Sequence, residues 1–113
     1  MSLAIKALFE PVRSIASGAI GVGYTGIGPV LAYPSRQIFI QNFTDAPLMF
    51  SLDSVNDHFP LPPYSFLLDD LSSNKTLETG FFLAKGDRLY VKQLGAAPML
   101  GTVYFSTLYG MDY

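Results

Sequence analysis

Charged side chains are scarce in this chain. Of its 113 residues, seven are Lys or Arg and nine are Asp or Glu, so only 14% of the chain is charged. About 25% is usual for a globular domain. The scarcity is localised, since residues 14–35 contain no charge and residues 93–113 contain only Asp112. A small domain leaves much of its area outside, and soluble surfaces are normally rich in charge. The sequence therefore predicts a surface that other subunits cover.

Cysteine and tryptophan are absent, and histidine occurs once. Without Cys, the chain can form no disulfide, no thiolate nucleophile and no sulfur-ligated metal site. A net charge of −2 gives no basic footprint for nucleic acid or for an anionic membrane. Residues 14–35 have the length of a membrane span, but their five glycines and two prolines make a poor helix. We expect no direct nucleic-acid partner and no membrane span.

Aromatic residues are as frequent as charged ones, with nine Phe and seven Tyr. Apolar residues recur with a period of two, which is typical of half-buried strands. Gly, Pro, Asn and Asp separate these runs at nearly regular spacing and mark turns. About six to eight short strands with such turns indicate an all-β fold. We expect an antiparallel β-sandwich of the jelly-roll kind, with a small barrel as the alternative.

Two neighbouring segments show the pattern clearly. Residues 36–43 place Ile38 and Ile40 on one face, and residues 48–53 alternate in the same way. The turn signal at residues 44–47 between them predicts a hairpin. No comparable helical period appears. The sole helix candidate is residues 3–9, because Pro11 would end it.

Residues 1–35 are expected to form an extended N-terminal arm, with a first strand near residues 15–25. Residues 36–113 then form the sandwich, and the whole chain is one domain. In the first strand, Ile20, Val22 and Tyr24 share a face, whereas the opposite face is nearly bare. A bare face lets another backbone or a partner approach closely. A glycine-rich arm that is flexible when free is the open alternative.

Residue types for catalysis or metal binding are few. His58 could act as a general base or a metal ligand, but a lone His beside Asp57 in a loop is more typical of a structural residue. Asp53 and Asp57 could bind calcium through oxygen, although their spacing lacks the glycine and glutamate of an EF-hand. Capping of turns by these carboxylates is the simpler interpretation. We expect no enzymatic activity, no cofactor and no metal site.

Several segments, taken in order, resemble small structural proteins of tailed-bacteriophage virions. Residues 38–59 (IFIQNFTDAPLMFSLDSVNDHF) are similar to the pattern IxNxTD…xxSxDGxxDHF, with Ser54 in place of its glycine. The pattern continues as LDxxSN, xGxxVYVK and GxVYxSxxYG, which resemble residues 68–74 (LDDLSSN), 85–92 (KGDRLYVK) and 101–110 (GTVYFSTLYG). The region of Arg13 to Tyr24 also looks similar. Each piece is weakly specific, and their order carries the resemblance.

The resemblance implies a non-enzymatic virion protein, above all a cement or decoration protein that stabilises the phage head. Its partners would be the major capsid protein and copies of itself as a homo-oligomer, assembled in the host cytoplasm. A neck, adaptor or tail ring component is one alternative. A carbohydrate-binding module for host attachment is another, because exposed aromatics also stack on sugars. Since buried aromatics dominate interfaces, we expect contacts on residues 14–35 and on the last strand, at Gly21, Gly23, Tyr24, Tyr33, Tyr104 and Tyr109.

Overall fold

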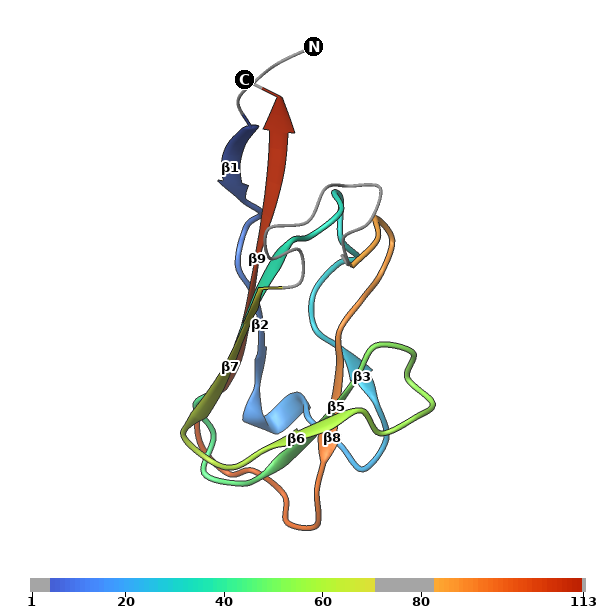
Figure 1. Cartoon of the computed structure of the whole chain (residues 1–113). Helices are drawn as coiled ribbons and strands as arrows, with labels where there is room; N and C mark the ends of the chain where they lie inside the picture. Colours follow the sequence, from blue (N-terminus) through green and yellow to red (C-terminus); the bar gives the residue numbers. More distant parts are fainter. Residues whose placement is uncertain (1–4, 71–82, 113) are drawn as a thin grey trace.

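Two antiparallel sheets pack face to face in this computed structural model, which describes residues 5–70 and 83–112 (Figure 1). Sheet A contains β1 (Ile5–Phe9), β2 (Arg13–Ala16), β4 (Gln37–Asn42), β7 (Ser65–Asp70) and β9 (Thr102–Asp112). Sheet B contains β3 (Thr25–Gly26), β5 (Leu48–Ser51), β6 (Phe59–Leu61) and β8 (Tyr90–Gln93). A short 3-10 helix, η1 (Ser17–Ala19), follows β2. The predicted all-β antiparallel sandwich is confirmed.

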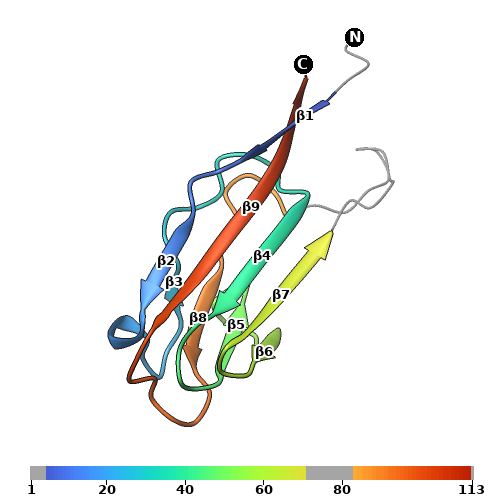
Figure 2. The ribbon, with the colours of Figure 1, turned by 90° about the vertical axis from the view of Figure 1, so that its left-hand side faces the viewer.

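Strand β9 organises sheet A. Its order is β1-β9-β4-β7, and β2 also pairs with β9 (Figure 2). β1 pairs with the end of β9, and β2 pairs with its beginning. Between β1 and β2, at Pro11, the strand is interrupted. The order of sheet B is β3-β8-β5-β6. Apart from β1, eight strands are divided equally between the sheets, which is consistent with the jelly-roll version of the sandwich.

The core lies between the sheets and follows from the period-two pattern. In β4, buried and half-buried residues alternate. Ile38 and Ile40 share one face, as predicted, and the structure shows that this face points into the core. In β9, Val103 and Phe105 do the same from the same sheet. Sheet B contributes Leu48, Phe50 and Val91, and Leu89 joins them from the position directly before β8; all four are buried.

The predicted hairpin of residues 36–53 is wrong, because β4 and β5 lie in different sheets. β4 pairs with β7 and β9, whereas β5 pairs with β6 and β8. The segment that passes from β4 in one sheet to β5 in the other is fixed by the buried side chain of Asn42. Its Nδ2 donates to the carbonyls of Ala46, Leu61 and Pro62 at 3.0–3.2 Å. Its Oδ1 accepts from the backbone N–H and the hydroxyl of Thr44. Both strands have one apolar face, and each covers the same core from opposite sides.

The predicted helix at residues 3–9 is also wrong where the structure describes it. Residues 5–9 form β1, because the end of β9 offers them an antiparallel partner from Leu108 to Asp112. β1 and this part of β9 project beyond the sandwich as a two-stranded ribbon (Figure 1). We call it the terminal ribbon.

The other part of the expected arm is built into the sandwich. Residues 13–35 form β2, η1 and β3, so the strand expected near residues 15–25 is divided into two. Four apolar side chains of this segment are buried in the core: Ile15, Ile20, Ile27 and Leu31. The segment therefore lacks charge partly because it covers the core. Within the described part of the expected arm, only β1 extends outward from the sandwich, as one strand of the terminal ribbon.

Candidate functional site

The side of sheet A that faces away from sheet B exposes large apolar side chains. Phe9 is 71% exposed, Phe66 is 65% exposed and Leu68 is 64% exposed. The registers place them together: Phe9 lies opposite Leu108, and Leu68 lies opposite Phe39. We call this surface the outer face, and its apolar members are Phe9, Phe39, Phe43, Phe66, Leu68, Tyr104 and Leu108.

Ring contacts connect these side chains into one surface. Phe39 and Phe66 meet edge to face, with ring centroids 5.7 Å apart, and Phe43 meets Tyr104 in the same way at 5.9 Å. Between β1 and β7 the outer face is hollowed to about 110 Å³, with no charged residue in the lining: Phe9, Gln37, Ile38, Phe39, Leu68, Ser106 and Leu108. A hollow of this kind suits one apolar side chain of a partner.

The exposed area is large enough to matter. At about 200 Å² for an aromatic side chain, the exposed parts of Phe9, Phe66 and Leu68 amount to roughly 400 Å². Patches of about 300–600 Å² are the largest on typical monomers and often mark interaction sites. The outer face is therefore a candidate for contact with another protein.

The terminal ribbon is attached to the sandwich by a stacked pair of tyrosines. The rings of Tyr33 and Tyr109 lie 4.1 Å apart and are tilted by only 4°. Burial of the Tyr109 hydroxyl, with the neighbouring Tyr33, raises the pKa of Tyr109. Both tyrosines are among the residues predicted at an interface with another subunit, and within this chain they contact each other.

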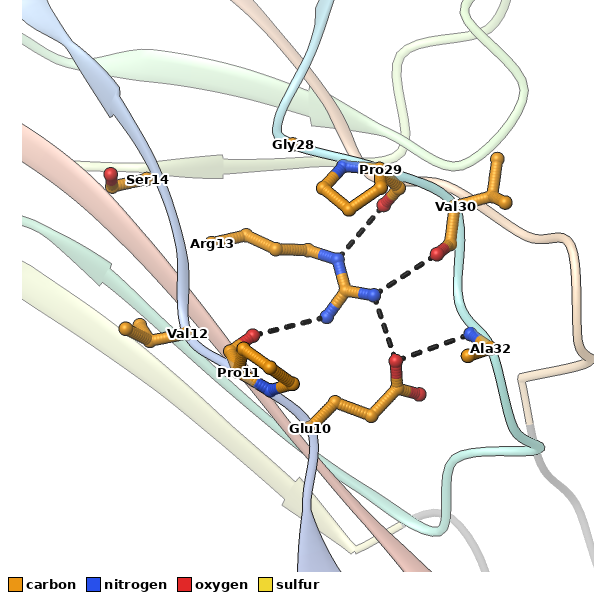
Figure 3. Close-up of a pocket in the computed structure, with 9 residues that line it drawn as sticks. All are labelled: Glu10, Pro11, Val12, Arg13, Ser14, Gly28, Pro29, Val30 and Ala32. Atoms are coloured by element: carbon orange, nitrogen blue, oxygen red, sulfur yellow. Dashed lines mark hydrogen bonds and ion pairs between the residues drawn. The ribbon is translucent and has the colours of Figure 1, made fainter.

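A buried ion pair between Arg13 and Glu10 fixes the short segment that connects β1 to β2. The Arg13 guanidinium donates to the carboxylate of Glu10 at 2.9 Å and to the carbonyls of Pro29 and Val30 at 2.8 and 3.0 Å (Figure 3). Glu10 in turn accepts from the backbone N–H of Ala32 at 3.1 Å. Only 6% of Glu10 and 5% of Arg13 is exposed.

This ion pair has a structural role. A hollow of about 430 Å³ lies beside it, and Val12, Pro29 and Val30 contribute apolar lining (Figure 3). The guanidinium donates to the carbonyls of Pro29 and Val30. The Glu10 carboxylate accepts from the backbone N–H groups of residues 32 and 33, so the ion pair as a whole joins residues 10–13 to residues 29–33. Burial raises the pKa of Glu10, but the hydrogen bond from Arg13 and those from two backbone N–H groups outweigh it and lower that pKa overall.

The loop between β5 and β6 uses Asp53 to close a turn. Its carboxylate accepts from the backbone N–H groups of Asn56 and Val55, both at 2.8 Å, and these bonds lower its pKa. His58 accepts the N–H of Leu52 through Nδ1 at 2.9 Å and holds the other side of the loop. The capping role expected for Asp53 is confirmed.

Asp57 has a different role from the one expected, because it does not cap a turn. It accepts from the hydroxyl of Tyr24 at 2.6 Å and pairs with Lys92 at 3.0 Å. Burial and the hydrogen bond to Asp57 raise the pKa of Tyr24 to about 12. Among the described residues, no group of three or more His, Asp or Glu side chains could hold a metal ion.

Ser54 occupies a left-handed backbone conformation with φ of 63°, where glycine is favoured. The resembled pattern has glycine at this position. Ser54→Gly should raise the free energy of unfolding by up to about 1 kcal/mol, because the strain of about 1–2 kcal/mol exceeds the added chain freedom of glycine. Urea denaturation of the variant and the natural protein measures this change in the free energy of unfolding. Ser54→Ala keeps the Cβ and should give no gain, so equal stability of the two variants would contradict the prediction.

The six residues expected at an interface lie in three places. Tyr104 is half-buried on the outer face, and Tyr33 and Tyr109 stack beside the terminal ribbon. Gly21, Gly23 and Tyr24 lie beside sheet B, where the carbonyl of Gly21 accepts from the N–H of Gln93 at 2.9 Å. A Cβ added at Gly21 or Gly23 would meet open space. The structure therefore joins only Tyr104 to the outer face.

Sequence reasoning did not find Phe9, Phe66 or Leu68. The alternation of Phe66 and Leu68 was evident, but it does not show which face of a strand is covered. No further signal in the sequence decides between the two faces.

No protein-family model matches the chain, and no curated protein matches it either. The resemblance to virion proteins therefore stays a prediction, and residues 71–74 of its second segment lie outside the described residues. No helix within the described part of the chain is long and apolar enough to cross a membrane.

Proposed function

We propose that this chain is a non-enzymatic structural protein of a tailed-phage virion, a cement or decoration protein that binds the outside of the head. The observation that carries the proposal is the outer face, which exposes aromatic and aliphatic side chains around an uncharged hollow. Apolar surface of this kind gains free energy when a partner removes it from water. The order of the resembling segments supplies the virion context.

The terminal ribbon adds to this support. A two-stranded ribbon alone is marginally stable in water, yet β1 and the end of β9 project beyond the sandwich (Figure 1). Beyond Leu108, β4 no longer pairs with β9. A partner that contacts the ribbon would stabilise it, and we assign that contact to a neighbouring subunit of the shell.

Such a protein would stabilise the shell by mass action. A subunit that binds the assembled lattice and not its separated parts adds its binding free energy to the stability of the assembly. Many weak contacts in a symmetric shell then act together through multivalency. Modest apolar contacts of each copy are therefore sufficient.

Occupancy on purified particles tests the proposal. Phe9→Lys places a charge on the outer face and should lower the copy number at least tenfold, since about 1.4 kcal/mol of lost contact has that effect. Val55→Lys is the matched control, because Val55 is an exposed valine in the loop between β5 and β6. Quantitative mass spectrometry of intact particles gives both copy numbers. Equal occupancy of the two variants would reject the outer face as the binding surface.

The copy number of the unmodified protein separates the head from other locations. Hundreds of copies per particle support a head protein, and about a dozen or fewer support the neck, adaptor or tail ring, given the symmetric rings that such components form. Absence from purified particles would reject the virion proposal altogether.

A further inference from the structure

The sheet edges differ in their ability to pair with another chain. The edge formed by β1 and β2 is interrupted at Pro11, and the β3 edge is only two residues long. β6 has three residues with Pro60 at its centre. Short edges and prolines are the usual means by which proteins prevent edge pairing. β7 has neither, since it offers six consecutive residues, Ser65–Asp70, without proline or glycine.

From Ser65 to Asp69, the outer edge of β7 has no neighbouring strand within the described part of the chain. β7 pairs with β4 on one side, and no described strand pairs with it on the other (Figure 2). Phe66 and Leu68 stand exposed on its outer side, and Leu67 packs against the border of the core. An edge with exposed apolar side chains is a template for strand addition.

Backbone strain beside this edge supports a binding role. Tyr64, directly before β7, has φ of 56° and is 66% exposed. A bulky residue rarely adopts this conformation, and such strain concentrates at ligand clamps and other functional positions. The strained residue therefore presents an aromatic ring at the start of the open edge.

We propose that β7 pairs with β7 of a second copy of this chain, antiparallel, so that two copies of sheet A form one continuous sheet. The two-fold axis passes at Leu67. This inference rests on the proposed function and deepens it, because it names a second copy as the neighbour at this edge. Dimers with such isologous contacts are the commonest oligomers.

The sequence of β7 fits pairing with itself. Opposite residues of two strands must share a face, so the axis has to pass through a residue. With the axis at Leu67, Phe66 lies opposite Leu68 of the second copy, and Ser65 lies opposite Asp69. An axis at Asp69 would place two carboxylates opposite each other, which is destabilising. The apolar pairs, and the distance between the carboxylates of the two copies, favour a second copy of this chain as the strand that pairs with β7.

The contact is small, and its size sets its expected strength. The exposed parts of Tyr64, Phe66 and Leu68 come to roughly 400 Å² per copy, which is about 800 Å² for a pair. Stable interfaces bury about 1,200–2,000 Å². The isolated dimer should therefore be weak and concentration-dependent, and neighbouring copies fixed on one lattice would strengthen it through effective concentration.

A cysteine scan tests the register, because the natural chain has no Cys. In Leu67→Cys, the two thiols face each other across the axis with Cα atoms about 4.5–5.5 Å apart, which a disulfide can bridge. In Ser65→Cys, the two thiols are offset by four residues, or about 13 Å, and cannot react. Under mild oxidation at high protein concentration, non-reducing electrophoresis should show a dimer for Leu67→Cys and a monomer for Ser65→Cys. A mixture of Ser65→Cys and Asp69→Cys should again give a dimer.

Two outcomes would overturn the inference: equal cross-linking of Leu67→Cys and Ser65→Cys, or no cross-linking of a folded Leu67→Cys. Leu68→Lys provides a second measurement at an exposed position. It should weaken self-association in sedimentation equilibrium at least tenfold with an unchanged melting temperature, and unchanged self-association would contradict pairing at this edge.

These measurements use the purified protein without particles, so they separate the two proposals. Failure to cross-link, together with normal occupancy on virions, would refute the pairing of β7 and leave the proposed function intact. Cross-linking in the predicted register, together with absence from virions, would refute the proposed function and leave the dimer.

Discussion

Arg13→Met should lower the free energy of unfolding by about 3–5 kcal/mol, the usual effect of removing one partner from a buried ion pair. The substitution leaves the Glu10 carboxylate, which is almost fully buried, without its 2.9 Å partner. It also removes hydrogen bonds to the carbonyls of Pro29 and Val30. Methionine keeps most of the aliphatic volume, so the loss reports the charge and its hydrogen bonds.

Lys6→Met is the matched control for this substitution. Lys6 lies in the neighbouring strand β1 and is exposed, so its loss should change stability by no more than about 0.5 kcal/mol. Denaturant titration of both variants gives the comparison. A loss below about 1 kcal/mol in Arg13→Met would show that water replaces the guanidinium at Glu10.

Acidification gives an independent readout of the same ion pair. The pKa of Glu10 in the folded protein lies below its ordinary value of 4.5, so the unfolded chain binds the proton first as pH falls. The contribution of Glu10 is present above about pH 4.5 and is lost as pH falls through the folded pKa. In Arg13→Met, the hydrogen bond and charge of Arg13 that lower the pKa of Glu10 are lost while burial still raises it, so this pKa should rise and the acid-side loss should become smaller. The difference in the free energy of unfolding between the natural protein and Arg13→Met should therefore become smaller as the pH is lowered.

Gly101→Ala should lower the free energy of unfolding by about 2–5 kcal/mol. Gly101 has φ of 92°, where an L side chain costs about 1–2 kcal/mol. An added Cβ would also collide with the carbonyl group of Phe43, which is backbone and cannot rotate away. Forced repacking of this kind costs a further 1–3 kcal/mol or so.

Gly95→Ala separates the two causes. Gly95 has φ of 94°, nearly the same as Gly101, but a Cβ there meets nothing within 4 Å. It should therefore lose only the conformational part, about 1–2 kcal/mol. Thermal or urea unfolding compares the two glycine variants. Equal losses would mean that the approach of residue 101 to Phe43 relaxes without cost.

The sandwich could be predicted from the sequence because alternation is a local signal. Spacing alone places Ile38 and Ile40 on one face of a strand, and the structure shows that both are buried. The pairing of strands was harder to predict, because β4 and β5 have the same alternation whether they form a hairpin or face each other. What decides between these arrangements is the buried Asn42 with its carbonyl partners, two of which, Leu61 and Pro62, are distant in sequence.

The candidate site was predictable only in part, for a related physical reason. An apolar alternation fixes which residues share a face, but the presence of a second sheet on one side decides which face is covered. Phe66 and Leu68 therefore could not be assigned to the outer face from the sequence. Likewise, β1 forms a strand because β9 lies beside it, and its short apolar run alone favours helix and strand equally.

Strand β9 passes without interruption from the terminal ribbon into the middle of sheet A, where β2 and β4 flank it. A tensile load applied to the end of β9 would enter the sheet along that strand. Because antiparallel ladder bonds run perpendicular to their strands, the load would shear both flanking ladders at once instead of opening them one bond at a time. A molecule pulled from this end should therefore unfold at high force and in one event.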